Sequence, residues 1–139
     1  MSDIDTPEVF HKGGKDPSDP RKVLPDRPGQ RHGKAATHSL KQMITTGQRV
    51  RAECYEMDQY SRSVCHVFAG SLNLNLEQLR RGWAMTPDRA EWIRDPLSEP
   101  AQKAAKAQRI GVWQDASPKS PADWRKECWG KGLCDGAEN

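Results

Sequence analysis

The sequence predicts one small domain of the α+β class, because strand patterns and helix patterns fall in separate stretches. Residues 49–57 alternate apolar and polar side chains, and residues 62–68 continue with a second strand-like run, as expected for the arms of a hairpin. The segments 33–45, 75–82 and 98–111 instead carry helical spacing or helix end signals. With 139 residues, of which 35% are hydrophobic, the chain can form one modest core.

Charge and hydropathy restrict the function only weakly. The formal net charge is +3 and the isoelectric point is near 8.7, which suits an anionic partner without requiring one. No stretch is apolar for long enough to span a bilayer, so a membrane partner is not expected. Residues 1–5 show neither a basic region nor an apolar region of a secretory signal.

The four cysteines form two local pairs along the sequence. A hairpin turn centred between Gln59 and Tyr60 places Cys54 opposite Cys65, close enough for a disulfide after slight adjustment. The other two candidates, Cys128 and Cys134, would close a small loop. Two such pairs indicate a periplasmic or secreted protein if an upstream signal exists, and otherwise a cytoplasmic one. The alternative, a zinc site at Cys54, Cys65 and His66, lacks a recognised ligand spacing.

The proposed domain covers residues 1–127 and contains a long irregular segment at 9–31. Two glycines and four prolines interrupt that segment, and no apolar period appears, which predicts an exposed loop or a lid. Residues 128–139 are expected to form a polar tail that carries two of the cysteines.

Local signals also predict where the helices begin and which faces they bury. Asn75 and Gln78 have the spacing of a capping box, and Gly82 is placed to end that helix. Ser98 is the expected N-cap of the next helix. Its closely packing face is predicted to consist of three alanines: Ala101, Ala104 and Ala105.

Two short motifs carry the chemistry. In Asp58-x-Tyr60-x-Arg62, a turn between strands would place a phenol and a guanidinium on one rim, a plausible grip for a phosphate. In Asp5-Thr6-Pro7-Glu8, a proline holds two carboxylates three residues apart. Carboxylates together with a phosphate clamp indicate metal-assisted phosphodiester chemistry.

Each motif also has a purely structural interpretation. Asp5 and Glu8 could belong to an ordinary proline turn whose side chain binds nearby backbone N–H groups. Arg62 could simply pair with Asp58 or Glu56 in the hairpin. The five tryptophans could stack on nucleic-acid bases, although their positions at helix ends favour the core.

The motifs in their order identify a known family. Leu74-Asn75, Leu79-x-x-Gly82-Trp83-Ala84 and Gly111-Val112-Trp113 follow the hairpin motif, and the series closes with Pro121-x-x-Trp124-Arg125. Together with Asp5-Thr6-Pro7-Glu8, this series resembles the thermonuclease (staphylococcal nuclease-like) family, particularly bacterial members ending in Pro-x-x-Trp-Arg. The resemblance covers about residues 4–125.

The resemblance implies an OB-type β-barrel with three helices and a calcium-dependent phosphodiesterase acting on DNA and RNA. By position, Asp5 would bind Ca²⁺ through its carboxylate and Thr6 through its backbone carbonyl. Glu8 would orient or deprotonate the attacking water. Arg62 would bind the phosphate and stabilise its developing charge, and Tyr60 would hydrogen-bond a phosphate oxygen.

This chain departs from the family pattern at its start. The family has three strands before the Asp-Thr-Pro-Glu segment, with a second calcium-binding aspartate and a second phosphate-binding arginine, whereas that segment here begins at residue 5. The expected barrel is therefore N-terminally truncated and incomplete. An internal start codon, a degenerate remnant, or a partner chain that completes the sheet would each account for this. Ser61 also replaces a glycine between Tyr60 and Arg62, which matters if that residue needs positive φ.

Two functions therefore remain open from the sequence. The first is a metal-dependent nuclease, or a truncated relative of one. The alternative is a non-catalytic module for nucleic-acid binding or protein interaction that kept the fold and lost the chemistry.

Overall fold

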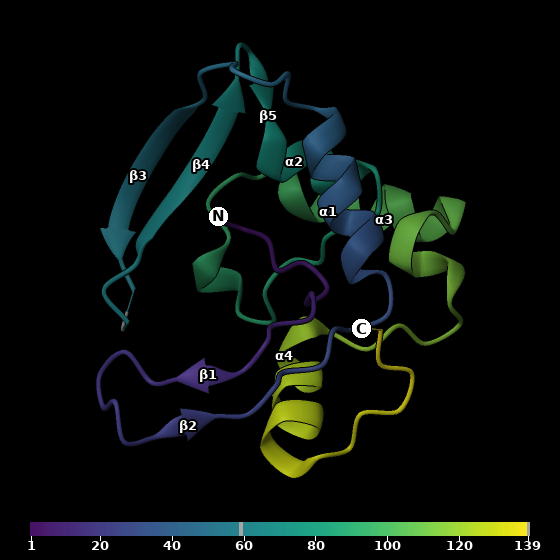
Figure 1. Cartoon of the computed structure of the whole chain (residues 1–139). Coiled ribbons are helices and arrows are strands. Elements are labelled where there is room, and N and C mark those ends of the chain that lie inside the picture. Colours follow the sequence, from purple (N-terminus) through teal and green to yellow (C-terminus); the bar gives the residue numbers. More distant parts are fainter. Residues whose placement is uncertain (59, 139) are drawn as a thin grey trace.

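A computed structural model describes residues 1–58 and 60–138 of the chain and shows an α+β arrangement (Figure 1). The α+β class predicted from the sequence is confirmed. The described elements are, in order, β1 Gly14–Lys15, β2 Val23–Leu24, α1 Gly33–Gln42, β3 Arg51–Met57, β4 Ser63–Ala69, β5 Leu72–Asn73, α2 Leu74–Arg80, η1 Ala90–Trp92, α3 Ser98–Gln108, η2 Gly111–Gln114, α4 Pro121–Trp124 and the π-helical turn η3 Arg125–Trp129.

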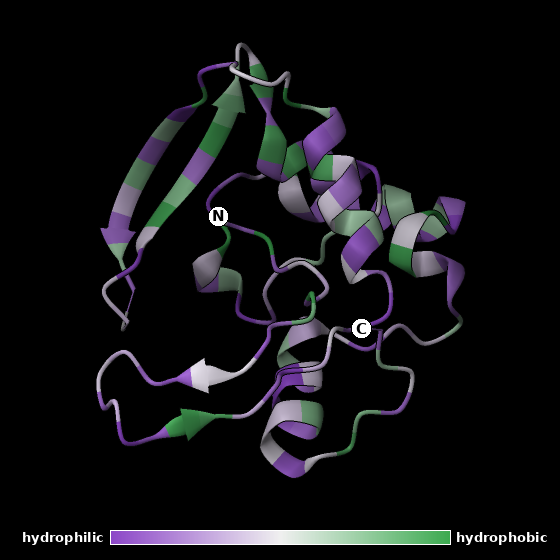
Figure 2. Ribbon diagram, in the orientation of Figure 1, coloured by the Kyte–Doolittle hydropathy of each residue, from purple (hydrophilic) through white to green (hydrophobic). Residues whose placement is uncertain are grey.

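Strands β3, β4 and β5 form an antiparallel sheet with β4 in the middle. Cys54 lies opposite Cys65 in its register, and the two sulfurs are 1.95 Å apart. Hydrophilic and hydrophobic residues alternate along β3 (Figure 2), yet every residue of this strand is exposed. The hairpin turn predicted at Gln59 and Tyr60 includes Gln59, which lies outside the described residues.

The two sheets of the described chain remain open. Strands β1 and β2 pair with each other, separately from the three-stranded sheet. The description as an incomplete OB-type barrel therefore stays a prediction. No helix within residues 1–58 and 60–138 has the length and apolar character needed to cross a membrane.

The core lies between α2 and α3. Leu79 and Ala105 are fully buried there, and Ile4 from the N-terminal segment packs against the same cluster. Gly82 follows the end of α2, as predicted, and has a φ of 72°. Its carbonyl accepts a hydrogen bond of 2.8 Å from the N–H of Val112, and a Cβ on Gly111 would lie 2.1 Å from that carbonyl. This close backbone approach requires glycine at position 111.

The segment predicted as a loop at 9–31 contains a short hairpin. Strands β1 and β2 form its arms, and the isolated bridge between His11 and Arg27 extends the pairing toward its base. The prediction missed this hairpin because strands of two residues show no hydrophobic period.

Three details of the helix predictions are wrong. The N-cap of α2 is Asn73, whose side chain accepts hydrogen bonds from the N–H groups of Asn75 and Leu76. Asn75 is instead buried inside the helix. Ser98 is the first helical residue of α3 rather than its N-cap, and Ala104 is exposed rather than part of the packed face.

Candidate active site

Backbone hydrogen bonds hold the acidic segment at both of its carboxylate residues. Asp5 and Met85 exchange two backbone hydrogen bonds, each of 2.8 Å. The carbonyl of Glu8 accepts a hydrogen bond of 2.7 Å from the N–H of Gln30. Gly33 begins α1 directly against the Glu8 carbonyl, where a Cβ would lie 2.2 Å from the oxygen. The loop is therefore fixed by two other parts of the chain, around residues 30–33 and at Met85.

The carboxylates of Asp5 and Glu8 converge on one cation, the guanidinium of Arg125. Nη2 of Arg125 lies 2.6 Å from Oδ2 of Asp5, and Nη1 lies 3.2 Å from Oδ1. The same Nη1 donates to Oε1 of Glu8 at 2.5 Å. The three side chains are partly exposed, with 33% of Asp5, 18% of Glu8 and 37% of Arg125 accessible. The hydrogen bonds that Arg125 donates to Asp5 raise the pKa of Arg125; burial opposes this effect and Glu8 adds to it, so the charge of Arg125 is permanent.

Contacts of the C-terminal segment fix the backbone on either side of Arg125. The side chain of Ser120 caps α4 by accepting from the N–H of Asp123. Trp124, which precedes Arg125, is 2% exposed. The indole N–H groups of Trp124 and Trp129 both donate to the carbonyl of Pro28, at 3.2 and 3.0 Å. Cys128 and Cys134 lie within bonding distance, with sulfurs 2.04 Å apart.

Gln30 links the acidic loop to this C-terminal segment. It is 5% exposed, and its backbone N–H binds Glu8 as described above. Its side-chain Nε2 donates to the carbonyl of Lys119 at 2.6 Å, just before α4. No individual role was predicted for Gln30 or Arg125 from the sequence. The Pro-x-x-Trp-Arg spacing marked the segment, but no local pattern revealed that it folds back onto residue 5.

The carboxylates of Asp5 and Glu8 supply some, but not all, of the oxygen ligands that a hard cation such as Ca²⁺ needs. Carboxylate oxygens that already surround one positive group face a common point, and oxygen is the ligand that Ca²⁺ prefers. However, no group of three or more His, Cys, Asp or Glu side chains with metal-binding geometry occurs among the described residues. A cation there would need the Thr6 carbonyl, water or substrate oxygens to complete its shell.

The predicted phosphate-binding residues lie elsewhere, at the tip of the β3–β4 hairpin. Asp58 accepts from Nε of Arg62 at 2.7 Å and from the backbone N–H groups of Tyr60 and Arg62. In Figure 1 the end of β3 and the start of β4 lie away from α4. Arg125 brings Asp5 and Glu8 together, whereas Arg62 pairs with Asp58. Ser61 has a φ of 58°, the positive value that favours the family's glycine at this position.

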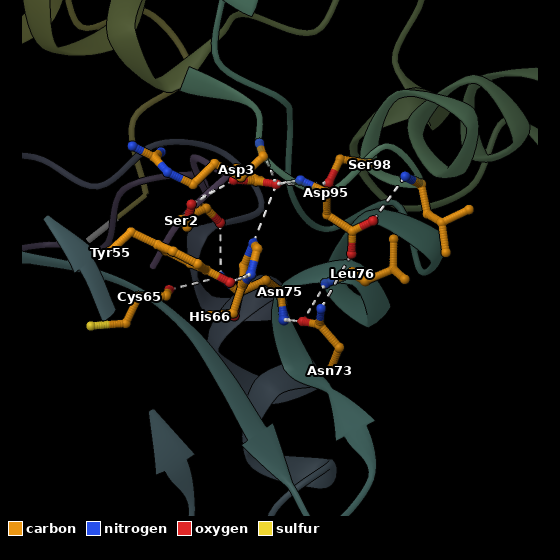
Figure 3. Close-up of polar contacts among 12 residues, drawn as sticks. Ser2, Asp3, Tyr55, Cys65, His66, Asn73, Asn75, Leu76, Asp95 and Ser98 are labelled. Atoms are coloured by element: carbon orange, nitrogen blue, oxygen red, sulfur yellow. Dashed lines mark hydrogen bonds and ion pairs between the residues drawn. The ribbon is translucent and has the colours of Figure 1, made fainter. Parts of the chain in front are cut away.

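A second carboxylate network surrounds Asp3, which the sequence analysis missed (Figure 3). Its buried side chain accepts from the backbone N–H groups of Arg94 and Asp95, at 3.0 and 2.6 Å. It also accepts from the hydroxyl of Ser2 at 2.5 Å. Nε2 of His66 lies 3.2 Å from Oδ2 of Asp3 without hydrogen-bond geometry.

This network continues to the sheet and lowers the pKa of Asp3. Burial raises the pKa, but the hydrogen bonds from Ser2, Asp95 and Arg94 and the nearby His66 outweigh it. The hydroxyl of Tyr55 on β3 and Nδ1 of His66 are 2.7 Å apart (Figure 3). The network therefore ties the N-terminus to β4 and to the segment before α3.

A cavity of about 250 Å³ is lined in part by Gln30, and its lining includes neither Asp5 nor Glu8. Its lining includes His32, Asp115 and Trp124. Asp115 already pairs with His32 at 3.0 Å and with Arg31 at 3.3 Å. The chemistry therefore favours the smaller hollow beside Asp5, which is also lined by Thr86, Asp88 and Pro121 among others.

Comparison with known proteins identifies the class of protein. Residues 1–115 match the family described as "Staphylococcal nuclease homologue". The chain is 30% identical over 129 residues to an "Uncharacterized endonuclease" of Haemophilus influenzae, a match covering 91% of this chain and 70% of that protein. It is 33% identical over 102 residues to the "Thermonuclease" of Staphylococcus intermedius, covering 68% of this chain and 58% of the relative. An "Uncharacterized endonuclease" of Escherichia coli O157:H7 is 30% identical over 97 residues, covering 69% and 61%.

The chain therefore belongs to the staphylococcal nuclease homologue family. The resemblance to the thermonuclease family inferred from the sequence is confirmed. The matched region ends at residue 115, so Arg125 and the helix that carries it lie outside it.

Proposed function

We propose that the chain is a calcium-dependent phosphodiesterase that hydrolyses DNA or RNA. The carrying observation is that Asp5 and Glu8, in a chain related to nucleases, direct their carboxylates at one cationic group. In this proposal Asp5 and the Thr6 carbonyl hold Ca²⁺, which neutralises charge on the phosphate when bound. Glu8 orients and deprotonates the attacking water.

Arg62 and Tyr60 supply phosphate contacts in the same proposal. Arg62 is 73% accessible, and Tyr60 is 69% exposed, so both side chains are open to a polyanionic strand. Nε of Arg62 donates to Oδ2 of Asp58 at 2.7 Å, and Nη2 lies 2.7 Å from the same oxygen. The same two nitrogens could bind a phosphate oxygen. A bound strand would have to bridge the hairpin tip and the carboxylates.

One observation favours the alternative of a non-catalytic module. The structure holds Arg62 against Asp58 and holds the carboxylates against Arg125, so the two predicted halves of the site do not meet. A protein that binds nucleic acid through the exposed hairpin alone would need no such meeting.

Cleavage of single-stranded DNA with Ca²⁺ and with a chelator distinguishes these functions. We expect Ca²⁺-dependent cleavage that falls by about 10²- to 10⁴-fold in Glu8→Gln, the usual contribution of a general base. Glu99→Gln, an exposed acid in the first turn of α3, is the control and should cleave like the wild type. DNA binding without cleavage by the folded wild type would support the non-catalytic module instead.

A further inference from the structure

Arg125 occupies the carboxylate oxygens of Asp5 that a divalent cation at this site would use. Its guanidinium contacts both oxygens of Asp5 and one oxygen of Glu8, so the oxygens best placed for a metal are already in use. Two carboxylates and one guanidinium leave a formal charge of −1 at the site. A divalent cation and Arg125 therefore compete for the same oxygens.

The anchoring of α4 and η3 means that the side chain, rather than the helix, must move when a cation binds. Buried Trp124, the two indole hydrogen bonds to Pro28 and the Cys128–Cys134 pair fix the backbone on either side of residue 125. The side chain itself is 37% accessible and can turn toward solvent. A displaced guanidinium would thus remain tethered at the edge of the carboxylates.

A tethered guanidinium at this edge is suited to a phosphate. Arginine presents a planar fork of N–H donors that binds carboxylate and phosphate in the same geometry. A phosphodiester bound beside a cation on Asp5 would place its non-bridging oxygens near the displaced group, while Glu8 would be free to bind water. Arg125 would then exchange its carboxylate partners for the phosphate of the substrate.

We propose that Arg125 is a phosphate-binding residue that pairs with Asp5 and Glu8 until a divalent cation displaces it onto the substrate phosphate. This inference rests on the proposed nuclease function. It assigns a role to a C-terminal segment that lies outside residues 1–115, the part of the chain matched by the family model.

Metal affinity measured without substrate tests the first half of the proposal. Tb³⁺, which mimics Ca²⁺, is titrated against the protein, and its luminescence is excited through tryptophan, since Trp124 adjoins the site. Arg125→Gln should tighten Tb³⁺ binding by about ten-fold or more, because it removes the competing charge. Asp5→Asn should weaken that binding. Arg81→Gln is the matched control. Arg81 has a similar accessibility, 38%, and its partner is Glu77, 2.9 Å away, rather than Asp5 or Glu8.

Cleavage kinetics at saturating Ca²⁺ test the second half. Arg125→Gln should lower kcat/KM for single-stranded DNA by about ten-fold or more despite its tighter metal binding, and Arg125→Lys should recover part of the loss by restoring the charge. Urea unfolding of each variant confirms that the folded protein is being compared.

The outcomes separate this inference from the proposed function. Unchanged Tb³⁺ affinity in Arg125→Gln, or tighter binding with cleavage equal to or above wild type, would overturn the role of Arg125 while leaving the nuclease proposal intact. If Asp5→Asn left Tb³⁺ affinity unchanged, both in the wild type and in the Arg125→Gln background, the metal site and the role of Arg125 would both be overturned.

Discussion

Asp3 and Asp5 are two residues apart, yet the structure uses their carboxylates in opposite ways. The Asp3 side chain is fully buried, and backbone N–H groups from a distant segment satisfy it. The Asp5 side chain is 33% accessible, and a single flexible side chain, Arg125, satisfies it. The fixed backbone groups around Asp3 leave its carboxylate no room to change partner, whereas a carboxylate bound by a replaceable cation can exchange that cation. The comparison separates a folding site from a candidate catalytic site within one short segment.

Asp3→Asn should give the largest loss of stability. The substitution removes the charge that strengthens hydrogen bonds from two backbone N–H groups and Ser2 in a buried position. We expect the free energy of unfolding to fall by about 2–4 kcal/mol, measured by urea denaturation. Asp5→Asn, the matched change at the exposed site, should cost about 1 kcal/mol or less. Equal losses in the two variants would contradict the distinction.

The pH dependence of stability gives a smaller effect with a defined sign. Because the pKa of Asp3 is lowered below its ordinary 3.8 in the folded protein, its ionised form stabilises the fold. This contribution is complete well above pH 3.8 and is lost as the pH falls from there through the lowered pKa. Each unit of lowering corresponds to about 1.4 kcal/mol.

Unfolding free energies between pH 6 and pH 2.5 measure that contribution. Asp3→Asn should lose less stability than the wild type on acidification, because it has no proton to bind at this position. Asp16 lies on another part of the chain, and its pKa is also lowered, chiefly by the hydroxyl of Ser18, so Asp16→Asn provides the control. An Asp3→Asn variant that is as acid-sensitive as the wild type would show that other carboxylates dominate.

Local patterns predicted the elements that depend on neighbouring residues. The hairpin register that pairs Cys54 with Cys65 follows from alternation and the turn, and it is present in the structure. The helix at 33–45 follows from an apolar period, and α1 covers most of it. Ordered motifs likewise predicted the family.

Contacts between distant segments could not be predicted in the same way. No local pattern pairs Arg125 with Asp5 or Glu8, which precede it by 120 and 117 positions. That contact depends on how the C-terminal segment packs, with Trp124 buried beside Arg125. The role of Asn75 was also wrongly predicted, because it too depends on contacts with other segments. It has the composition of a cap but serves a buried network, accepting from the N–H of Val67 and donating to the carbonyls of Ser2 and Cys65.

Arg62→Ala should have the smallest effect on stability and a large effect on cleavage, which extends the comparison to the hairpin tip. Its guanidinium is 73% accessible, so its pairing with Asp58 is screened by water and its loss should leave the unfolding midpoint unchanged. Cleavage should fall by about 10²- to 10³-fold if Arg62 stabilises charge on the phosphate. Arg80→Ala, a 53% accessible arginine on α2, is the control for a general loss of positive charge. Arg62 and the carboxylates do not meet in the structure. If Arg62→Ala cleaved like the wild type, Asp5, Glu8 and Arg125 would be the whole site. If Arg62→Ala lost cleavage and Arg80→Ala did not, bound nucleic acid would have to join the two regions.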